Sequence, residues 1–309
     1  MAAQGADITA ADFNALYNKI SNMLGTGDGS YGYGQAVQSA GVVSGQKITK
    51  EQWSKLRYDL ISIWIHQTGN TPSLVVPGQN TGNVITYSSN DAYVNYDTLA
   101  NIARSNRFEV ATGQFIISNI GSGSYTYTSS WKNSATIEVS AVFSNSNQAR
   151  YFFNSGGKIR ISATREGGAN TSQNNTWTNA LESLGEIDFG AGTDPINNFY
   201  TLTNSFEPYL QSRLTTPYSD NLIIFEAKCN VASNVTGTAT EVTIKMTLLD
   251  AYDDSVVPAW TPDIWSPDDL VDGTLTINLS EIRASGYLQP SGTLAIVAPT
   301  YTVTGITAS

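Results

Sequence analysis

Residues 8–24 read ITAADFNALYNKISNML and residues 48–64 read ITKEQWSKLRYDLISIW. When the second run is laid on the first, identical or similar residues fall at the same places: Ile8/Ile48, Thr9/Thr49, Phe13/Trp53, Leu16/Leu56 and Ile20/Leu60. Agreement in register of this kind indicates a degenerate internal repeat, in which both copies form the same element of structure.

Both copies carry the signals that begin a helix. Thr9 and Thr49 are placed as N-caps, and Asp12 and Gln52 three residues later complete a capping box. The apolar residues that follow recur at helical spacing, which predicts two amphipathic helices. We expect their apolar faces to pack on each other or on a partner subunit, with seven interface candidates: Phe13, Leu16, Ile20, Trp53, Leu56, Leu60 and Trp64.

The sequence up to residue 110 extends this helical part. Glycines across residues 25–46 exclude a regular helix there, so we expect a shaped loop that contains two tyrosines. A connector rich in Pro and Gly follows at residues 70–83, and a third helix is predicted from about Asn90 or Asp91 to Ser105. Residues 1–110 are therefore interpreted as a helical attachment or oligomerisation module.

From about Gly113 onward the apolar pattern changes to strict alternation. Residues 137–143, 223–231, 242–248 and 275–279 alternate apolar and polar side chains, as half-buried strands do. Turn clusters separate these segments, and this arrangement favours an antiparallel sandwich. The predicted fold class is α+β, mainly β, with residues 111–309 forming an antiparallel β-sandwich-like body.

Two segments of the β part have local signals of their own. YFFNSGGKIRIS, residues 151–162, predicts a hairpin in which residues 154–157 turn the chain and Phe153 joins a buried face. TWTNALESLGEIDFG, residues 176–190, predicts a short helix that Gly185 ends.

Composition and charge exclude several classes of function. Charged residues make up 14% of the chain, and the formal net charge is -10. No cluster of Lys and Arg is present to neutralise phosphates, so we expect no nucleic-acid partner and no anionic membrane surface. Because Cys229 is the sole cysteine, no intrachain disulfide forms, and we expect folding in a reducing cytoplasm without a secretory signal.

Few residues are equipped for catalysis. His66 is the single histidine, and we interpret it as a residue of the last helical turn that bonds carbonyl groups or meets the helix dipole. Cys229 has the inward parity of a strand, which is typical of a small buried hydrophobe. The sequence therefore predicts no catalytic residue, no cofactor and no metal.

Acidic residues leave two alternatives open. A polysaccharide depolymerase needs only two carboxylates, and oxygen-rich loops such as DAYDDS or GTGDGS could hold calcium, although neither has the spacing of a specific calcium loop. Turn formation and solvation are the simpler interpretation of these side chains. The candidates are Glu186, Asp188, Asp250, Asp253, Asp254, Asp263, Asp268, Asp269 and Asp272.

Aromatic residues leave a further alternative. Trp260 and Trp265 could stack on sugars, which would make the chain an adhesin that recognises host surface glycans. Most of the 16 Tyr and 6 Trp are expected to be core or contact residues. The sequons at Asn170, Asn174, Asn234 and Asn278 carry no glycan without a secretory route.

Two strings are distinctive enough to suggest a family. The repeated unit ITAADFNALYNKISNMLGTGDGSYGYGQ with ITKEQWSKLRYDLISIWIHQTG, and QARYFFNSGGKIRISATREGG at residues 148–168, resemble signatures of virion structural proteins of tailed bacteriophages. The resemblance is to myovirus-like phages of cyanobacteria and other marine bacteria, and it covers about a third of the chain. It implies a non-enzymatic subunit of the tail, baseplate, neck or a fibre, located in the virion and contacting copies of itself and other virion proteins.

Overall fold

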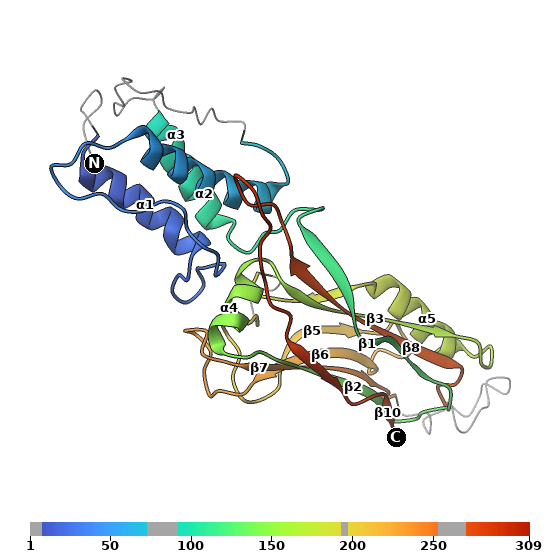
Figure 1. The fold of residues 1–309 in the computed structure, drawn as a ribbon. Coiled ribbons are helices and arrows are strands. Elements are labelled where there is room, and N and C mark those ends of the chain that lie inside the picture. The colour runs from blue at the N-terminus through green and yellow to red at the C-terminus, as the bar shows by residue number, and fades with distance from the viewer. Residues whose placement is uncertain (1–7, 73–91, 193–196, 253–269) are drawn as a thin grey trace.

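The computed structural model describes residues 8–72, 92–192, 197–252 and 270–309. Within them the chain is α+β, mainly β, as predicted, with an N-terminal helical part followed by a β-rich body (Figure 1). The helical module consists of α1 (Ala10–Leu24), α2 (Lys50–Thr68) and α3 (Ala92–Ser105), and it lies at one end of an elongated molecule.

Both predicted capping boxes are present. The Thr9 hydroxyl accepts from the Asp12 amide while the Asp12 carboxylate accepts from the Thr9 amide, and Thr49 and Gln52 repeat this exchange. The third helix ends at Ser105, as its pattern indicated. The predicted connector at residues 70–83 lies mostly outside the described residues.

The three helices run parallel to one another. Near their first turns Trp53 packs edge-on against Phe13, at 5.2 Å between ring centroids, and against Tyr96, at 5.4 Å. Near their last turns the Gln67 amide donates to the Ala103 carbonyl oxygen at 2.9 Å. All three C-terminal ends therefore point toward the β body (Figure 1), and the segment 25–49 has to return along the length of α1.

The body contains two antiparallel sheets. One has the strand order β1-β8-β3-β4, and the other has the order β10-β2-β7-β6-β5 with β9 also paired to β2. The strands are β1 (Phe115–Tyr127), β2 (Ser134–Val142), β3 (Lys158–Glu166), β4 (Ile187–Phe189), β5 (Glu207–Arg213), β6 (Leu222–Cys229), β7 (Glu241–Leu249), β8 (Thr274–Ala284), β9 (Thr300–Val303) and β10 (Thr307–Ala308).

Alternating side chains of both sheets form the core of the body. Along β2 every second residue is buried, and β6 and β8 show the same alternation. The register places Ile137 opposite Met246 and Phe225 opposite the same Met246, so three strands meet through apolar pairs. The predicted strands at residues 137–143, 223–231, 242–248 and 275–279 are confirmed.

The predicted hairpin at residues 151–162 is wrong in its first half. Ser146–Asn154 form a helix, α4, and only Lys158 onward enters a strand. The Asn145 side chain caps this helix by accepting from the Gln148 amide at 3.0 Å. Ala149, Phe152 and Phe153 are fully buried at helical spacing, which outweighs the strand propensity of the aromatic run.

The predicted short helix is confirmed as α5 (Ser172–Leu184), which Gly185 follows as its C-cap. It begins earlier than predicted because Thr171 caps it, accepting from the Asn174 amide at 3.1 Å. Trp177 on α5 packs edge-on against Trp131 at 5.1 Å between ring centroids. The buried ring of Trp177 thus closes one end of the sandwich core.

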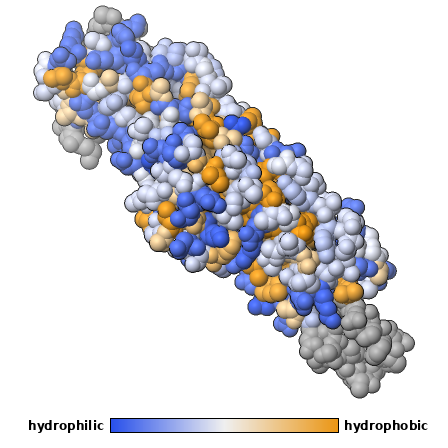
Figure 2. Space-filling view, turned by 60° about the horizontal axis from the view of Figure 1, so that its bottom comes forward, coloured by the Kyte–Doolittle hydropathy of each residue, from blue (hydrophilic) through white to orange (hydrophobic). Residues whose placement is uncertain are grey.

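The C-terminal segment covers an edge of the larger sheet. β9 and β10 both pair with β2, and the Ser309 carbonyl oxygen accepts from the Asn133 amide at 2.8 Å. The C-terminus therefore lies at the end of the body remote from the helical module (Figure 1). Figure 2 shows hydrophobic residues gathered along the middle of one face of the molecule, among hydrophilic ones.

Candidate functional site

A network of buried polar side chains lies where the helical module meets the body. This junction begins with the glycine-rich loop that follows α1. The amides of Tyr33 and Gln35 donate to the carbonyl oxygens of Met23 and Leu24, both at 2.9 Å, and so satisfy the last turn of α1. Gly32 has φ 97°, and a Cβ there would lie 2.2 Å from the Thr26 carbonyl oxygen, so only glycine fits.

Arg150 on α4 binds the carbonyl oxygens of this loop. Its Nε donates to Gly29 at 2.9 Å, and its Nη2 donates to Tyr31 at 2.8 Å and to Thr26 at 3.2 Å. The guanidinium is planar and presents its donors in a fixed fork, so these bonds fix the loop in one position. Arg150 is 8% exposed, and the cost of burying its charge is offset by these charge-assisted bonds.

Asn154, at the end of α4, binds the same loop from a second direction. Its fully buried amide donates to the carbonyl oxygens of Tyr31 at 2.9 Å and Gly32 at 3.2 Å. The Tyr200 hydroxyl donates to Gly29 at 2.8 Å, and burial raises the pKa of Tyr200 to about 12. Three side chains of the body therefore hold one loop of the module.

Aromatic and cationic groups complete this part of the junction. The Arg107 guanidinium lies 4.4 Å from the centroid of the Phe108 ring and 5.0 Å from that of Tyr31. Phe108 stacks on Tyr200 at 6.2 Å, which links the end of the module to the body. A hydrogen bond from Arg104 lowers the pKa of Tyr31. Arg104 in the last turn of α3 also offsets the negative end of that helix dipole.

His66 is buried within the junction. Its Nε2 lies 3.1 Å from the Ser155 carbonyl oxygen, and because a carbonyl only accepts, we place the proton on Nε2. Its Nδ1 has no hydrogen-bond partner among the described residues. Burial lowers its pKa to about 4, so the ring is neutral at ordinary pH. His66 lies in the last turn of α2 and bonds a carbonyl, as interpreted, but that carbonyl belongs to Ser155, which follows α4.

Further bonds tie the junction to the segment after β8. The Gln289 amide donates to the Ser62 hydroxyl at 2.8 Å, and the Ala295 amide donates to the Gln35 side chain at 2.9 Å. Asp59, fully buried on α2, accepts from the amides of Gln38 at 3.1 Å and Ser39 at 2.8 Å. α2 therefore contacts its neighbouring helices, its own return loop and the body.

The structure places the predicted interface candidates inside the module. Trp64 is half-buried and packs against the hydrophobic core. The other six are at most 2% exposed, so they pack on one another within this chain, and a partner does not reach them while the module is folded: Phe13, Leu16, Ile20, Trp53, Leu56 and Leu60. The sequence left open whether the helices pack on each other or on a partner subunit, and in the structure they pack on each other.

The predicted acidic candidates that are described serve the fold. Asp188 and Glu186 both pair with Arg160, at 2.7 Å and 2.5 Å, and these contacts raise the pKa of Arg160. Asp250 accepts from the buried Gln173 amide at 2.7 Å. The remaining candidates lie outside the described residues: Asp253, Asp254, Asp263, Asp268 and Asp269.

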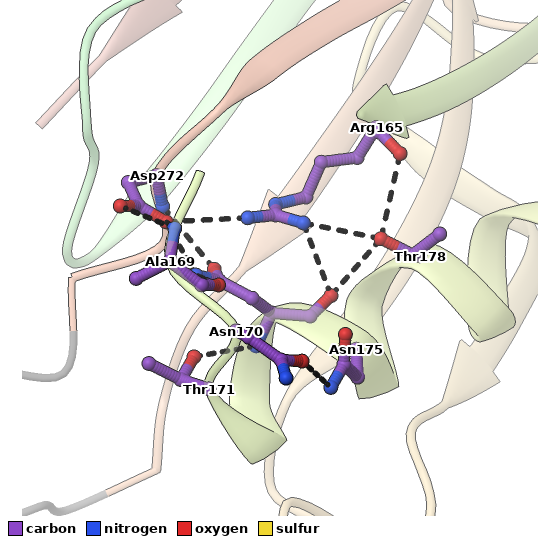
Figure 3. Close-up of polar contacts among 8 residues, drawn as sticks. Arg165, Ala169, Asn170, Thr171, Asn175, Thr178 and Asp272 are labelled. Atoms are coloured by element: carbon purple, nitrogen blue, oxygen red, sulfur yellow. Dashed lines mark hydrogen bonds and ion pairs between the residues drawn. The ribbon is translucent and has the colours of Figure 1, made fainter. Parts of the chain in front are cut away.

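Asp272 belongs to a polar cluster that fastens α5 (Figure 3). Its carboxylate accepts from the Ala169 amide at 3.0 Å and from Arg165 Nη2 at 3.3 Å. Arg165, 5% exposed, also donates to the Thr178 hydroxyl at 3.1 Å. Asn174, a sequon position, is fully buried in this cluster and donates to Asp272. The cluster ties α5 to β3 and to the segment before β8.

No group of described residues offers a metal site of at least three His, Cys, Asp or Glu. Cys229 is free and buried, as predicted, and burial raises the pKa of its thiol. In the loop GTGDGS, for which calcium was left open as an alternative, the Gly29 carbonyl oxygen is bound by Arg150. No helix among the described segments has the length and apolar character needed to cross a membrane.

The surface also has a polar hollow of about 330 Å³ on the outer face of the smaller sheet. It is relevant to glycan binding because Arg160, Glu186 and several Ser and Asn side chains line it. No aromatic ring belongs to its described lining, so a sugar would have polar contacts there without a stacking surface. Trp260 and Trp265 lie outside the described residues.

No family model, no curated protein and no solved structure matches this chain. The sequence signatures and the geometry of the junction are therefore the basis for a function.

Proposed function

We propose that the chain is a structural subunit of a tailed-bacteriophage virion, which assembles through contacts with copies of itself and with other virion proteins. The junction carries this proposal. The carbonyl oxygens of the glycine-rich loop are held by Arg150, Asn154 and Tyr200, of which the first two are buried and the third is half-buried. This network holds the helical module and the β body as one elongated unit.

A fixed, elongated shape suits a part that must present surfaces at a constant separation. Satisfied buried polar networks specify a single arrangement, because each unmade bond would cost about 1–3 kcal/mol. The small share of charged residues, 14%, suits lasting contact with other proteins. The virion assignment itself is supported by the resemblance of the two sequence signatures.

The test is the composition of purified particles. Phage particles whose genome encodes this chain are banded by density, and their proteins are quantified by mass spectrometry against a non-structural phage enzyme as the contamination control. We expect the chain at a fixed copy number relative to the capsid protein, and immunogold label at one place on the particle. Recovery only in the soluble lysate, at the level of the control enzyme, would exclude the proposal.

The second candidate is an adhesin for host surface glycans, which the polar hollow beside Arg160 favours. A glycan array probed with the full chain distinguishes it. Binding that Arg160→Ala weakens at least tenfold would support the adhesin, and silence across the array would count against it. The matched control is Lys132→Ala, a charge removed elsewhere on the body.

A further inference from the structure

The free edges of the two sheets differ in how they are protected. An exposed edge strand offers unpaired N–H and C=O groups to any other strand, and proteins usually cover or charge such edges. One edge of the larger sheet, β2, is covered by β9 and β10. Its other edge, β5, carries Glu207 and Arg213, contains Pro208 and is interrupted by a register shift.

The smaller sheet has one protected edge and one unprotected edge. β4 is only 3 residues long, and its Asp188 is paired with Arg160. β1 at the other edge is 13 residues long, and its sequence FIISNIGSGSYTY contains neither a charged residue nor a proline. A register shift between Asn119 and Ser124 leaves residues 115–119 as a regular segment paired with β8.

Residues 115–119 are unpaired on the side away from β8. Within the described parts of the chain, no backbone hydrogen bond joins this segment to anything except β8. Ile116 is 41% exposed and Ile117 is 55% exposed, although successive residues of a strand point to opposite faces. This end of β1 therefore exposes apolar side chains on both faces as well as a bare edge.

We propose that this edge pairs antiparallel with the same edge of a second copy of the chain, about a twofold axis at Ile117. The pairing joins the two smaller sheets into one continuous sheet. It deepens the assembly role proposed above and rests on it, because it names one surface by which copies meet.

The edge is self-complementary, which favours a second copy as the occupant. Each chain has a net charge of -10, so copies repel one another except where the contact surface is neutral, and β1 has no charge along its length. In this register Ile117 lies opposite itself, Ile116 opposite Ser118, and Phe115 opposite Asn119, so no like charges meet. A twofold contact uses the same patch on both copies, which closes the pair and prevents growth into fibres.

A pairing of five residues is short. Stable interfaces bury about 1,200–2,000 Å² in total, and a segment of this length contributes less. We therefore expect weak dimers of the isolated chain that form as its concentration rises. In an assembled particle, where neighbours hold the copies together, the same contact becomes effectively intramolecular.

The test is cross-linking of the full chain with Ile117→Cys. Directly opposite residues of antiparallel strands have Cβ atoms about 4.5–5.5 Å apart, within reach of a disulfide after small adjustment. Under mild oxidation we expect a disulfide-linked dimer. The matched control is Val235→Cys, because Val235 is 70% exposed on a loop of the other sheet, and the native Cys229 is only 4% exposed.

A second variant does not depend on disulfide chemistry. Ile117→Lys places two like charges opposite each other, and sedimentation should show dimerisation weakened at least tenfold with an unchanged melting temperature. Equal cross-linking of Ile117→Cys and Val235→Cys, or cross-linking only to a different particle protein, would overturn the pairing. If the pairing fails while the chain is still found in particles, the assembly role stands. A chain that cross-links through Ile117→Cys but is absent from particles would instead support the pairing and exclude the virion role.

Discussion

The two copies of the helical repeat share one face and differ in the other. α1 and α2 have the same capping box and the same buried positions, with Leu16 equivalent to Leu56. On the second face, three α1-side residues line an open hollow of about 890 Å³: Lys19, Asn22 and Thr26. Their α2 equivalents are fully or almost fully buried: Asp59, Ser62 and His66.

This difference identifies α2 as the helix that contacts the body with its second face, in addition to the attachment through the glycine-rich loop that follows α1. A helix with one buried face packs on its neighbours, whereas a helix buried on two faces has to satisfy polar groups in the interior. Asp59 bonds the return loop, Ser62 bonds Gln289, and His66 bonds Ser155. The shared face packs the helices on one another, and the second face of α2 adds contacts with the return loop and the body.

The greatest loss of stability is expected on the face that the two helices share. Leu16→Ala and Leu56→Ala should each lower the free energy of unfolding by about 2–5 kcal/mol, because each leaves a cavity at a fully buried site. Chemical denaturation measures both, and each loss should fall within that range. A loss confined to Leu56→Ala would mean that α1 is not an equal part of the core.

The next largest effect is a pH dependence of stability that arises from His66 on the second face of α2. His66 has a pKa of about 4 in the folded chain against an ordinary 6.5, so the unfolded chain binds a proton first as the pH falls. The stability that the neutral ring contributes is complete above about pH 6.5, and about 3 kcal/mol of it is lost by pH 4. Denaturation of the unaltered chain and of His66→Gln across this range measures it.

Carboxylates also titrate near pH 4, so the difference between the two chains is the informative quantity. Glutamine keeps a donor for the Ser155 carbonyl oxygen and does not ionise. The advantage of the unaltered chain over His66→Gln should shrink from pH 7 to pH 4. Parallel stability profiles would show that His66 does not titrate between the folded and unfolded states.

A smaller loss of stability is expected at Asp59 of α2, and it can be compared with the loss at the equivalent charged residue of α1, Lys19. Asp59→Ala should cost about 1–3 kcal/mol, because the amides of Gln38 and Ser39 lose their buried acceptor. The matched change in α1 is Lys19→Ala, which removes a half-buried ion pair with Asp97 and should cost at most about 1 kcal/mol. Equal costs would contradict the conclusion that only α2 is buried on its second face.

A small effect is also expected at the shared caps. Thr9→Ala and Thr49→Ala should each cost about 1 kcal/mol, since each removes the acceptor for an N3 amide. In α1 the same change should also raise the pKa of Asp12, which the Thr9 side chain holds below its ordinary value. Titration followed by NMR measures that change, and an unchanged pKa of Asp12 in Thr9→Ala would exclude the reciprocal bond.

Much of the fold could be predicted because its signals are local. The capping boxes, the third helix and the alternation along β2, β6, β7 and β8 are written in consecutive residues, and the structure confirms them. Gly185 likewise marks the end of α5. At such places propensity and burial agree, so the sequence alone is sufficient.

The junction could not be predicted because its bonds join distant residues. Arg150 binds Gly29, and Ser62 binds Gln289, and no spacing rule connects such pairs. The aromatic run at α4 led to a wrong prediction of a strand. Phe152 and Phe153 have high strand propensity, but tertiary packing buries both of them on a helix. One signal was available in the sequence. Asp59, Ser62 and His66 recur on one face of α2, at positions that would be exposed to solvent in a simple surface helix.

A cryo-EM map of the intact phage particle would test the virion role and the fixed junction together. We expect density for several copies of this chain, each with α1–α3 docked end-on against the β body through the loop that Arg150 holds. A fully interpreted particle map in which no density fits this chain would contradict its proposed role as a virion subunit.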